Sequence, residues 1–290
     1  MRSITALKSL FISAAVLAIA GCTSRPPIHP ASSATVSIYD RVISTGVIRC
    51  GYVTYPPGFI TSPNGNAPSG IFADLMETAA HNLNLRIEWT KETGWASMIE
   101  DLNTDKFDMV CSPVWANSTR ARLADFGTPI YYSAIGVYVR RGDTRFNDNL
   151  AAINMPTITI ATIDGEMSSI IAASDFPKAR VVSLPQMADD SQLLLNVATG
   201  HADVAFVEPA VAESYSAQNA GSVYNAAAAH PIRYFPTSVM FRKRQPEFAS
   251  MIDVALEEQL NSGAVDKLFV KYNVPKGAFL LPALPYRPAR

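Results

Sequence analysis

Residues 107–129, FDMVCSPVWANSTRARLADFGTP, lie at the end of a repeating alternation of strand-like and helix-like segments. The β-prone run at 107–110 follows a stretch of helical spacing at 95–102. Before these come β-prone runs at 47–53 and 85–89, separated by apolar residues at helical spacing over 71–83. Strands and helices in this order predict a mostly parallel sheet covered by helices.

The pattern restarts after residue 130. A long β-prone segment covers 134–139, and a second series of strands and helices follows it. We expect strands at 157–161, 179–183 and 204–207, and helices at 167–173, 190–199, 247–260 and 263–272. Two similar α/β units, one interrupted by the other, predict a two-lobed α/β protein with a ligand cleft between the lobes.

The N-terminus has the order of a secretory signal. Arg2 and Lys8 precede an apolar run at 10–20, which is too short to span a bilayer as a helix. Ile19-Ala20-Gly21-Cys22 resembles the lipobox of bacterial lipoproteins, which implies cleavage before Cys22 and acylation of its thiol, as by palmitate. The alternative is an ordinary signal peptide with an incidental cysteine.

Composition excludes several classes of partner. Without residues 1–21 the chain has 22 basic and 25 acidic residues, a formal charge of −3, which argues against nucleic acid. The four histidines are scattered without metal-ligand spacing, so neither a metal nor a cofactor is expected. Cys50 and Cys111 lie in strand-like runs of an exported chain, and either a disulfide or two buried thiols is consistent with that.

Residues 36–275 resemble one family, the type II periplasmic binding proteins, in the branch of extracellular solute-binding proteins that take amino acids. The resemblance is carried by the order and spacing of short motifs. These are DRVISTGVIRCG at 40–51, YPP at 55–57, GIFADL at 70–75, FDMV at 107–110 with Thr119-Arg120, DFGTP at 125–129, and GHADVA at 200–205. It implies lobe 1 at 36–130 and 236–275 and lobe 2 at 131–235. Outside the resemblance, the residues themselves indicate a signal peptide at 1–21, a Pro- and Ser-rich tether at 22–35 and a Pro-rich tail at 276–290.

The resemblance also implies ligand-binding residues. Arg120 stands where the family keeps an arginine that grips the ligand carboxylate, and its planar fork suits that role. Tyr55 and Trp95 match the aromatic rings that sandwich the ligand. Glu208 matches an aspartate that meets the ligand's amino group. The alternatives that do not use the resemblance are a surface arginine at Arg120, packing of its own helix for Trp95, and a solvated loop acid before Pro209 for Glu208.

This chain departs from the family pattern at several of these positions. Trp115 and Asn117 stand where Ser or Thr is usual, and Gly165-Glu166-Met167 replaces a Gly-Thr-Thr that donates to the carboxylate. Backbone N–H groups at that helix start remain available to an anion. We also expect an acidic rim of Glu166, Glu208 and Asp74 to favour a ligand that carries positive charge as well as a carboxylate, although an acid at 74 also suits the first turn of a helix.

These features together predict the substrate-binding lipoprotein of an ABC-type uptake system. The protein is expected on the periplasmic or cell-surface side of a membrane, closing around an amino acid or related polar solute and presenting it to the permease. The crossings near Tyr131 and Tyr234 to Pro236 are expected to act as the hinge. Two alternatives stay open: a secreted dehydratase for prephenate-like acids (cyclohexadienyl or arogenate), with Glu208 or Glu166 as general acid, and a sensory lipoprotein with a degenerate cleft.

Overall fold

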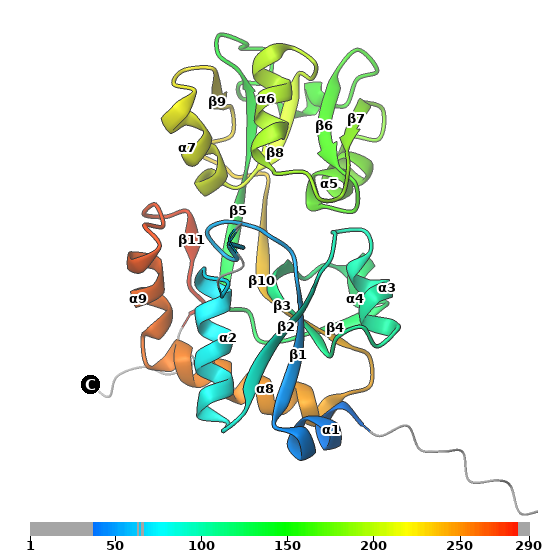
Figure 1. Cartoon of the computed structure of the whole chain (residues 1–290). Coiled ribbons are helices and arrows are strands. Elements are labelled where there is room, and N and C mark those ends of the chain that lie inside the picture. Colours follow the sequence, from blue (N-terminus) through cyan, green and yellow to red (C-terminus); the bar gives the residue numbers. More distant parts are fainter. Residues whose placement is uncertain (1–36, 63, 65–66, 284–290) are drawn as a thin grey trace, which may run out of the picture. The chain divides into compact units, whose positions relative to one another are not determined.

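The computed structural model describes residues 37–62, 64 and 67–283, and these belong to one compact unit. Their strands form a mixed sheet in the order β2-β1-β3-β10-β5-β8-β6-β7, with β4 on β10 and with β9 and β11 on β5 (Figure 1). The expected signal peptide, the tether and Cys22 lie outside the described residues. Among the described helices, none is long and apolar enough to cross a membrane.

One group of elements, called the β1 side below, gathers around three parallel strands. The strands are β1 (Val47–Tyr52), β2 (Arg86–Glu92) and β3 (Met109–Trp115), with β4 (Ala124–Phe126) near them. The helices are α1 (Ile38–Thr45), α2 (Ile71–Asn82), α3 (Met98–Asn103), α4 (Ser118–Ala121), α8 (Pro246–Asn261) and α9 (Ala264–Lys271). All seven residues of β3 are buried, as expected of a parallel strand covered on both faces.

A disulfide joins Cys50 of β1 to Cys111 of β3, with their Cα atoms 5.5 Å apart. The two strands are neighbours in the parallel sheet, where Cys50 pairs with Met109. This resolves the alternative that the sequence left open between a bridge and two free thiols.

The second group, called the β6 side, repeats the arrangement. Its strands are β6 (Thr159–Ile163), β7 (Arg180–Leu184), β8 (Val204–Val207) and β9 (Val223–Asn225), of which β7, β6 and β8 run parallel. Its helices are α5 (Met167–Asp175), α6 (Ser191–Thr199), α7 (Pro209–Gln218) and the 3-10 helix η1 (Leu150–Ile153). The expected strands and helices of this half are present, and η1, α7 and β9 are additions.

Two ten-residue strands, β5 (Tyr131–Arg140) and β10 (Arg233–Arg242), connect the two sides (Figure 1). They pair antiparallel from Tyr131 with Thr237 to Ile135 with Arg233. Both segments expected to act as a hinge therefore lie within these strands. The sequence pattern did not predict β10 as a strand, because Pro236 interrupts its β-prone run.

Residues 276–290, expected as a Pro-rich tail, contribute a short strand to the sheet near their start. Strand β11 (Phe279–Leu280) pairs with Tyr132 and Ser133 of β5. The ring of Phe279 is buried and stacks on Tyr131, with the ring centroids 4.2 Å apart. Apolar burial thus holds this segment on the sheet. Residues 284–290 lie outside the described residues.

Candidate functional site

Arg120 lies where the β1 side meets the β6 side. Helix α4 presents it, and Asn117 caps that helix by accepting a hydrogen bond from the Arg120 backbone N–H at 3.0 Å. The guanidinium donates to the carbonyl oxygen of Trp115 at 3.2 Å and to that of Gly165, on the β6 side, at 2.8 Å. Arg120 is 4 % exposed, and burial lowers its pKa to about 10, although the charge of Glu166 opposes the shift. It is not a surface arginine.

Three aromatic rings form a wall beside Arg120. The indoles of Trp95 and Trp115 are parallel, with centroids 6.4 Å apart, and Tyr55 meets each of them edge-on at 5.7 Å. The Arg120 guanidinium carbon lies 5.8 Å from the Trp95 ring centroid, within the range of a cation–π contact. Trp115 therefore has a place in the site although the family resemblance predicts a hydroxyl residue there.

Glu166 occupies the start of α5 with its own side chain. Its carboxylate accepts the backbone N–H of Ser168 at 2.6 Å and also the Ser168 hydroxyl. Glu166 is 1 % exposed, and burial raises its pKa while these hydrogen bonds and Arg120 oppose the rise. The helix N-terminus that the sequence left available to an anion therefore already holds a carboxylate of the protein.

Glu208 is fully buried, and neither of its carboxylate oxygens has a hydrogen-bond partner within the described structure. It stands at the N-cap of α7, directly before Pro209, so it is not a solvated loop acid. Burial raises its pKa to about 7, although the side chains of Ser133, Tyr55 and Trp115 lie close enough to oppose the rise. The hydroxyls of Tyr55 and Tyr131, whose own pKa values are raised first by burial and then by the Glu208 charge, also lack partners.

Asp190 is a fourth ionisable group of this site, which the sequence did not single out. It stands at the N-cap of α6, is 7 % exposed, and makes no side-chain capping hydrogen bond. Burial, followed by the charges of Glu166 and Glu208, raises the pKa of Asp190 well above its usual value. Its position resembles that of any acid at a helix start, so the pattern carried no signal that it is buried among other acids.

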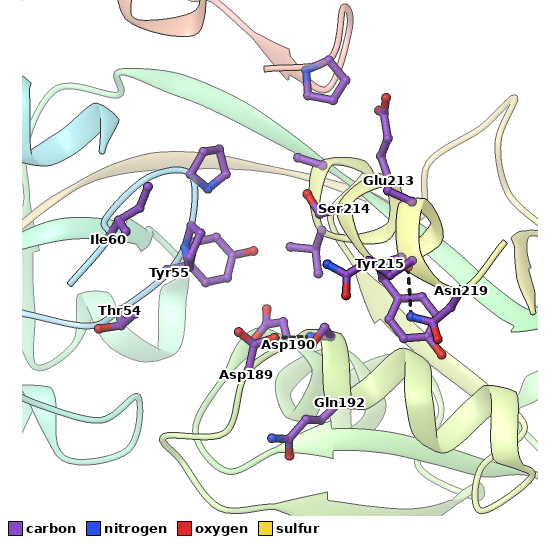
Figure 2. Close-up of a pocket in the computed structure, with 18 of the residues that line it drawn as sticks. Thr54, Tyr55, Ile60, Asp189, Asp190, Gln192, Glu213, Ser214, Tyr215 and Asn219 are labelled. Carbon is purple, nitrogen blue, oxygen red and sulfur yellow. Dashed lines mark hydrogen bonds between the residues drawn. The ribbon is translucent and has the colours of Figure 1, made fainter. Parts of the chain in front are cut away.

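A cavity of about 690 Å³ opens next to this cluster (Figure 2). Thr54, Tyr55 and Ile60 line it from the β1 side, whereas Asp190, Glu213 and Tyr215 line it from the β6 side. Figure 2 shows the Tyr55 ring and Asp190 facing the same space. Tyr55 and Asp190 thus belong both to the cavity and to the buried cluster around Glu208.

The two sides also touch through Gln186, in the segment between β7 and α6. Its side-chain oxygen accepts the backbone N–H groups of Ala96, at 3.1 Å, and Ser97, at 3.0 Å, just before α3. Two glycines allow the two sides to approach this closely. A Cβ on Gly165, whose φ is +72°, would lie 2.6 Å from Ala96 Cα, and one on Gly94 would lie 2.6 Å from the Gln186 side chain.

The structure thus brings together Tyr55, Trp95, Trp115, Arg120, Gly165, Glu166 and Glu208. Asn117 acts as a helix cap. Asp74 is not in this cluster, because its carboxylate pairs with Lys271 and accepts the Tyr272 hydroxyl. Among the described residues, no group of three or more His, Cys, Asp or Glu side chains is arranged to hold a metal.

The family model "Bacterial extracellular solute-binding proteins, family 3" matches residues 48–275. The chain belongs to this family. Its members are extracellular binding proteins for small solutes. The observed sheet, with two parallel units joined by two crossing strands, agrees with the type II periplasmic-binding-protein fold of its structural neighbours.

Several relatives carry more specific names. The chain is 26 % identical to a probable histidine-binding protein of Neisseria gonorrhoeae over 211 residues, which cover 72 % of this chain and 76 % of that protein. It is 24 % identical to the L-cystine-binding protein TcyA of Bacillus subtilis over 275 residues, covering 92 % and 96 %. A solved structure of the ancestral amino acid-binding protein AncCDT-1, a precursor of cyclohexadienyl dehydratase, superposes with a TM-score of 0.69 at 25 % identity, covering 81 % and 99 %.

Proposed function

We propose that this protein is the substrate-binding component of an ABC-type uptake system and that it closes around an amino acid or a related small polar solute. The observation that carries the proposal is Glu208, a fully buried carboxylate whose two oxygens accept no hydrogen bond from the residues that the structure describes. An unpaired buried charge destabilises a protein, so it is retained where a ligand completes it. Relatives named for histidine and cystine binding support an amino-acid ligand.

In this proposal, the β1 side and the β6 side are two lobes. Arg120 and Gln186 make hydrogen bonds between them, and the cavity opens on both. Strands β5 and β10 are the crossings about which the lobes would rotate. A ligand that contacts both lobes favours the closed form only when it is bound, and the membrane permease would read that form.

Within the cleft, Tyr55, Trp95 and Trp115 would offer apolar faces to the ligand, and Glu208 would accept from its amino group. Arg120 would face the ligand's carboxylate with the N–H groups that its two carbonyl partners leave over. Gly165 would contribute through the backbone that approaches Arg120. Cys22 would carry a lipid anchor that keeps the protein at the membrane after export.

The direct test is a thermal-shift screen of the purified protein against amino acids and related solutes. At a hundred times Kd a ligand stabilises the folded state by about 2.7 kcal/mol, which gives a clear rise in melting temperature. We expect a shift with an amino acid or close relative. If no amino acid or related solute stabilises the protein at millimolar concentration, the proposal is wrong.

We propose further that the protein does no chemistry on its ligand. Incubation with prephenate, followed by product absorbance, tests this directly. Turnover by the wild type that E208Q abolishes would contradict the proposal. The lipid anchor is tested separately, because C22A would release the protein from the membrane fraction.

A further inference from the structure

The donors and acceptors of the site are unequally satisfied. On the donor side, Arg120 already donates to two carbonyl oxygens, and the α5 N-terminus donates to Glu166. On the acceptor side, both oxygens of Glu208 are without a partner, and Asp190 makes no side-chain capping bond. The groups that would bind an anion are therefore largely occupied by the protein, whereas the oxygens of Glu208 accept no hydrogen bond from the described residues.

The charges of the cluster show the same imbalance. Arg120 faces Glu166, and the two offset each other. Glu208 and Asp190 remain, and the charge of Glu208 adds to burial in raising the pKa of Asp190. Among the residues that line the adjacent cavity, Asp189 and Glu213 add negative charge and no lysine or arginine offsets it. A net-neutral solute leaves this excess in place, whereas an organic cation neutralises it.

We propose that Asp190 and Glu208 together form a receptor for an ammonium or guanidinium group, and that the ligand of this protein is an organic cation. The proposal rests on the function proposed above and narrows its ligand class. The cation would lie beside Tyr55, which lines the cavity and whose hydroxyl lacks a partner, and the rest of the ligand would extend toward the cavity. Either a cationic amino acid or a diamine supplies this chemistry.

Asp190 is the residue that sets the preference for a cationic ligand. Glu208 is fully enclosed, whereas Asp190 lies at the boundary between the buried cluster and the cavity, where a second charge of an extended ligand would arrive. Asp266 offers a control, because it is also an acid at the start of a helix, in the first turn of α9, but it is exposed and does not line the cavity.

Titration calorimetry of the purified protein at pH 8 tests the proposal with L-lysine, L-norleucine and cadaverine. Norleucine lacks the side-chain ammonium of lysine, and cadaverine lacks its carboxylate. We expect lysine to bind at least about 30-fold more tightly than norleucine, and D190N to abolish most of that difference, because a buried charge pair is lost. D266N is expected to stay within about twofold of the wild type, since a screened surface charge away from the cavity contributes little. The melting temperature of each variant reports whether it is folded.

The outcomes distinguish failure of the cation receptor from failure of the proposed amino-acid ligand. Equal affinity for lysine and norleucine, or equal effects of D190N and D266N, would overturn the cation receptor and leave amino-acid binding intact. Binding of cadaverine but of neither amino acid, with dependence on Asp190, would support the receptor and contradict the amino-acid ligand. Binding of none of the three, where the thermal-shift screen finds a neutral amino acid that binds, would overturn the cation receptor alone.

Discussion

The guanidinium of Arg120, on the β1 side, donates at 2.8 Å to the carbonyl oxygen of Gly165, on the β6 side. This hydrogen bond joins the two sides next to the aromatic wall and next to Glu166, whose carboxylate partly offsets the buried charge. Arg120 therefore connects the two sides in addition to its proposed contact with a ligand. Its replacement should affect closure and binding together.

Replacement of Arg120 by lysine is expected to weaken ligand binding by more than about tenfold, because an ammonium does not reproduce the planar fork. We also expect a loss of ~1–3 kcal/mol in the free energy of unfolding from broken hydrogen bonds to a buried charge. R122K, a change at an exposed arginine two residues away, is the control and should have little effect. Calorimetric titration and chemical denaturation provide the measurements, and wild-type affinity in R120K would contradict this role.

Gln186 should stabilise the closed arrangement without entering the site. Its side chain accepts two backbone N–H groups of the opposite side, so Q186A removes both hydrogen bonds. We expect a loss of ~1–2 kcal/mol in binding, or roughly 5- to 30-fold in affinity. The radius of gyration from small-angle X-ray scattering should increase at subsaturating ligand.

The control for Gln186 is Q192A. Gln192 is exposed and lines the cavity from α6, and its side chain makes no hydrogen bond to the β1 side within the described structure. Equal effects of Q186A and Q192A would show that the bonds of Gln186 do not hold the two sides together.

The unliganded protein is expected to lose stability as the pH rises from about 4.5 to about 7. Burial raises the pKa of Glu208 from 4.5 to about 7, so the folded state holds this proton more tightly than the unfolded state does. Protonated Glu208 contributes roughly 3 kcal/mol to the free energy of unfolding. This contribution is fully present below pH 4.5 and is lost as the pH rises through 7. Glu166 and Asp190, whose pKa values are also raised, act with the same sign.

Denaturation of E208Q across the same pH range checks this account. The variant should lose part of the pH dependence and be more stable than the wild type at pH 8, because the uncompensated buried charge is absent. A wild-type free energy of unfolding that stays constant from pH 5 to pH 8 would rule out this role of Glu208.

The Cys50–Cys111 disulfide closes a loop with a sequence separation of 61 residues. Its loss in the double variant C50A/C111A should cost roughly 2–4 kcal/mol of stability. Calorimetric melting of the oxidised protein, the reduced protein and the variant provides the measurement. Two free thiols in the unfolded, unreduced protein, beyond any from Cys22, would contradict the bridge.

The elements of the fold followed from local patterns. Helical spacing predicted the region of α2, and the buried β-prone run predicted β3. The strand β10 and the helix α7 were not predicted, because Pro236 and Pro209 suggest turns in isolation. Tertiary pairing with β5 holds Pro236 in a strand, and Pro209 is favourable at the first position of a helix.

The site was predictable where a family motif marks it and not where burial alone creates it. Arg120, Trp95 and Glu208 follow from spacing, although their present contacts do not. Asp190 acquires its raised pKa from enclosure beside acids that are far away in the sequence. Glu166 illustrates the same limit, because an acid at a helix start does not reveal that it fills the anion position of that helix.

The central claim is that Glu208 is buried without a hydrogen-bond partner among the described residues because a ligand supplies one. The most direct measurement is calorimetric titration of wild type and E208Q at pH 8 with the solute that stabilises the protein most in the screen. The account predicts at least about 30-fold weaker binding by E208Q, from the loss of a buried charge pair, with an unliganded melting temperature at or above that of the wild type. Unchanged affinity in a folded E208Q protein would contradict it.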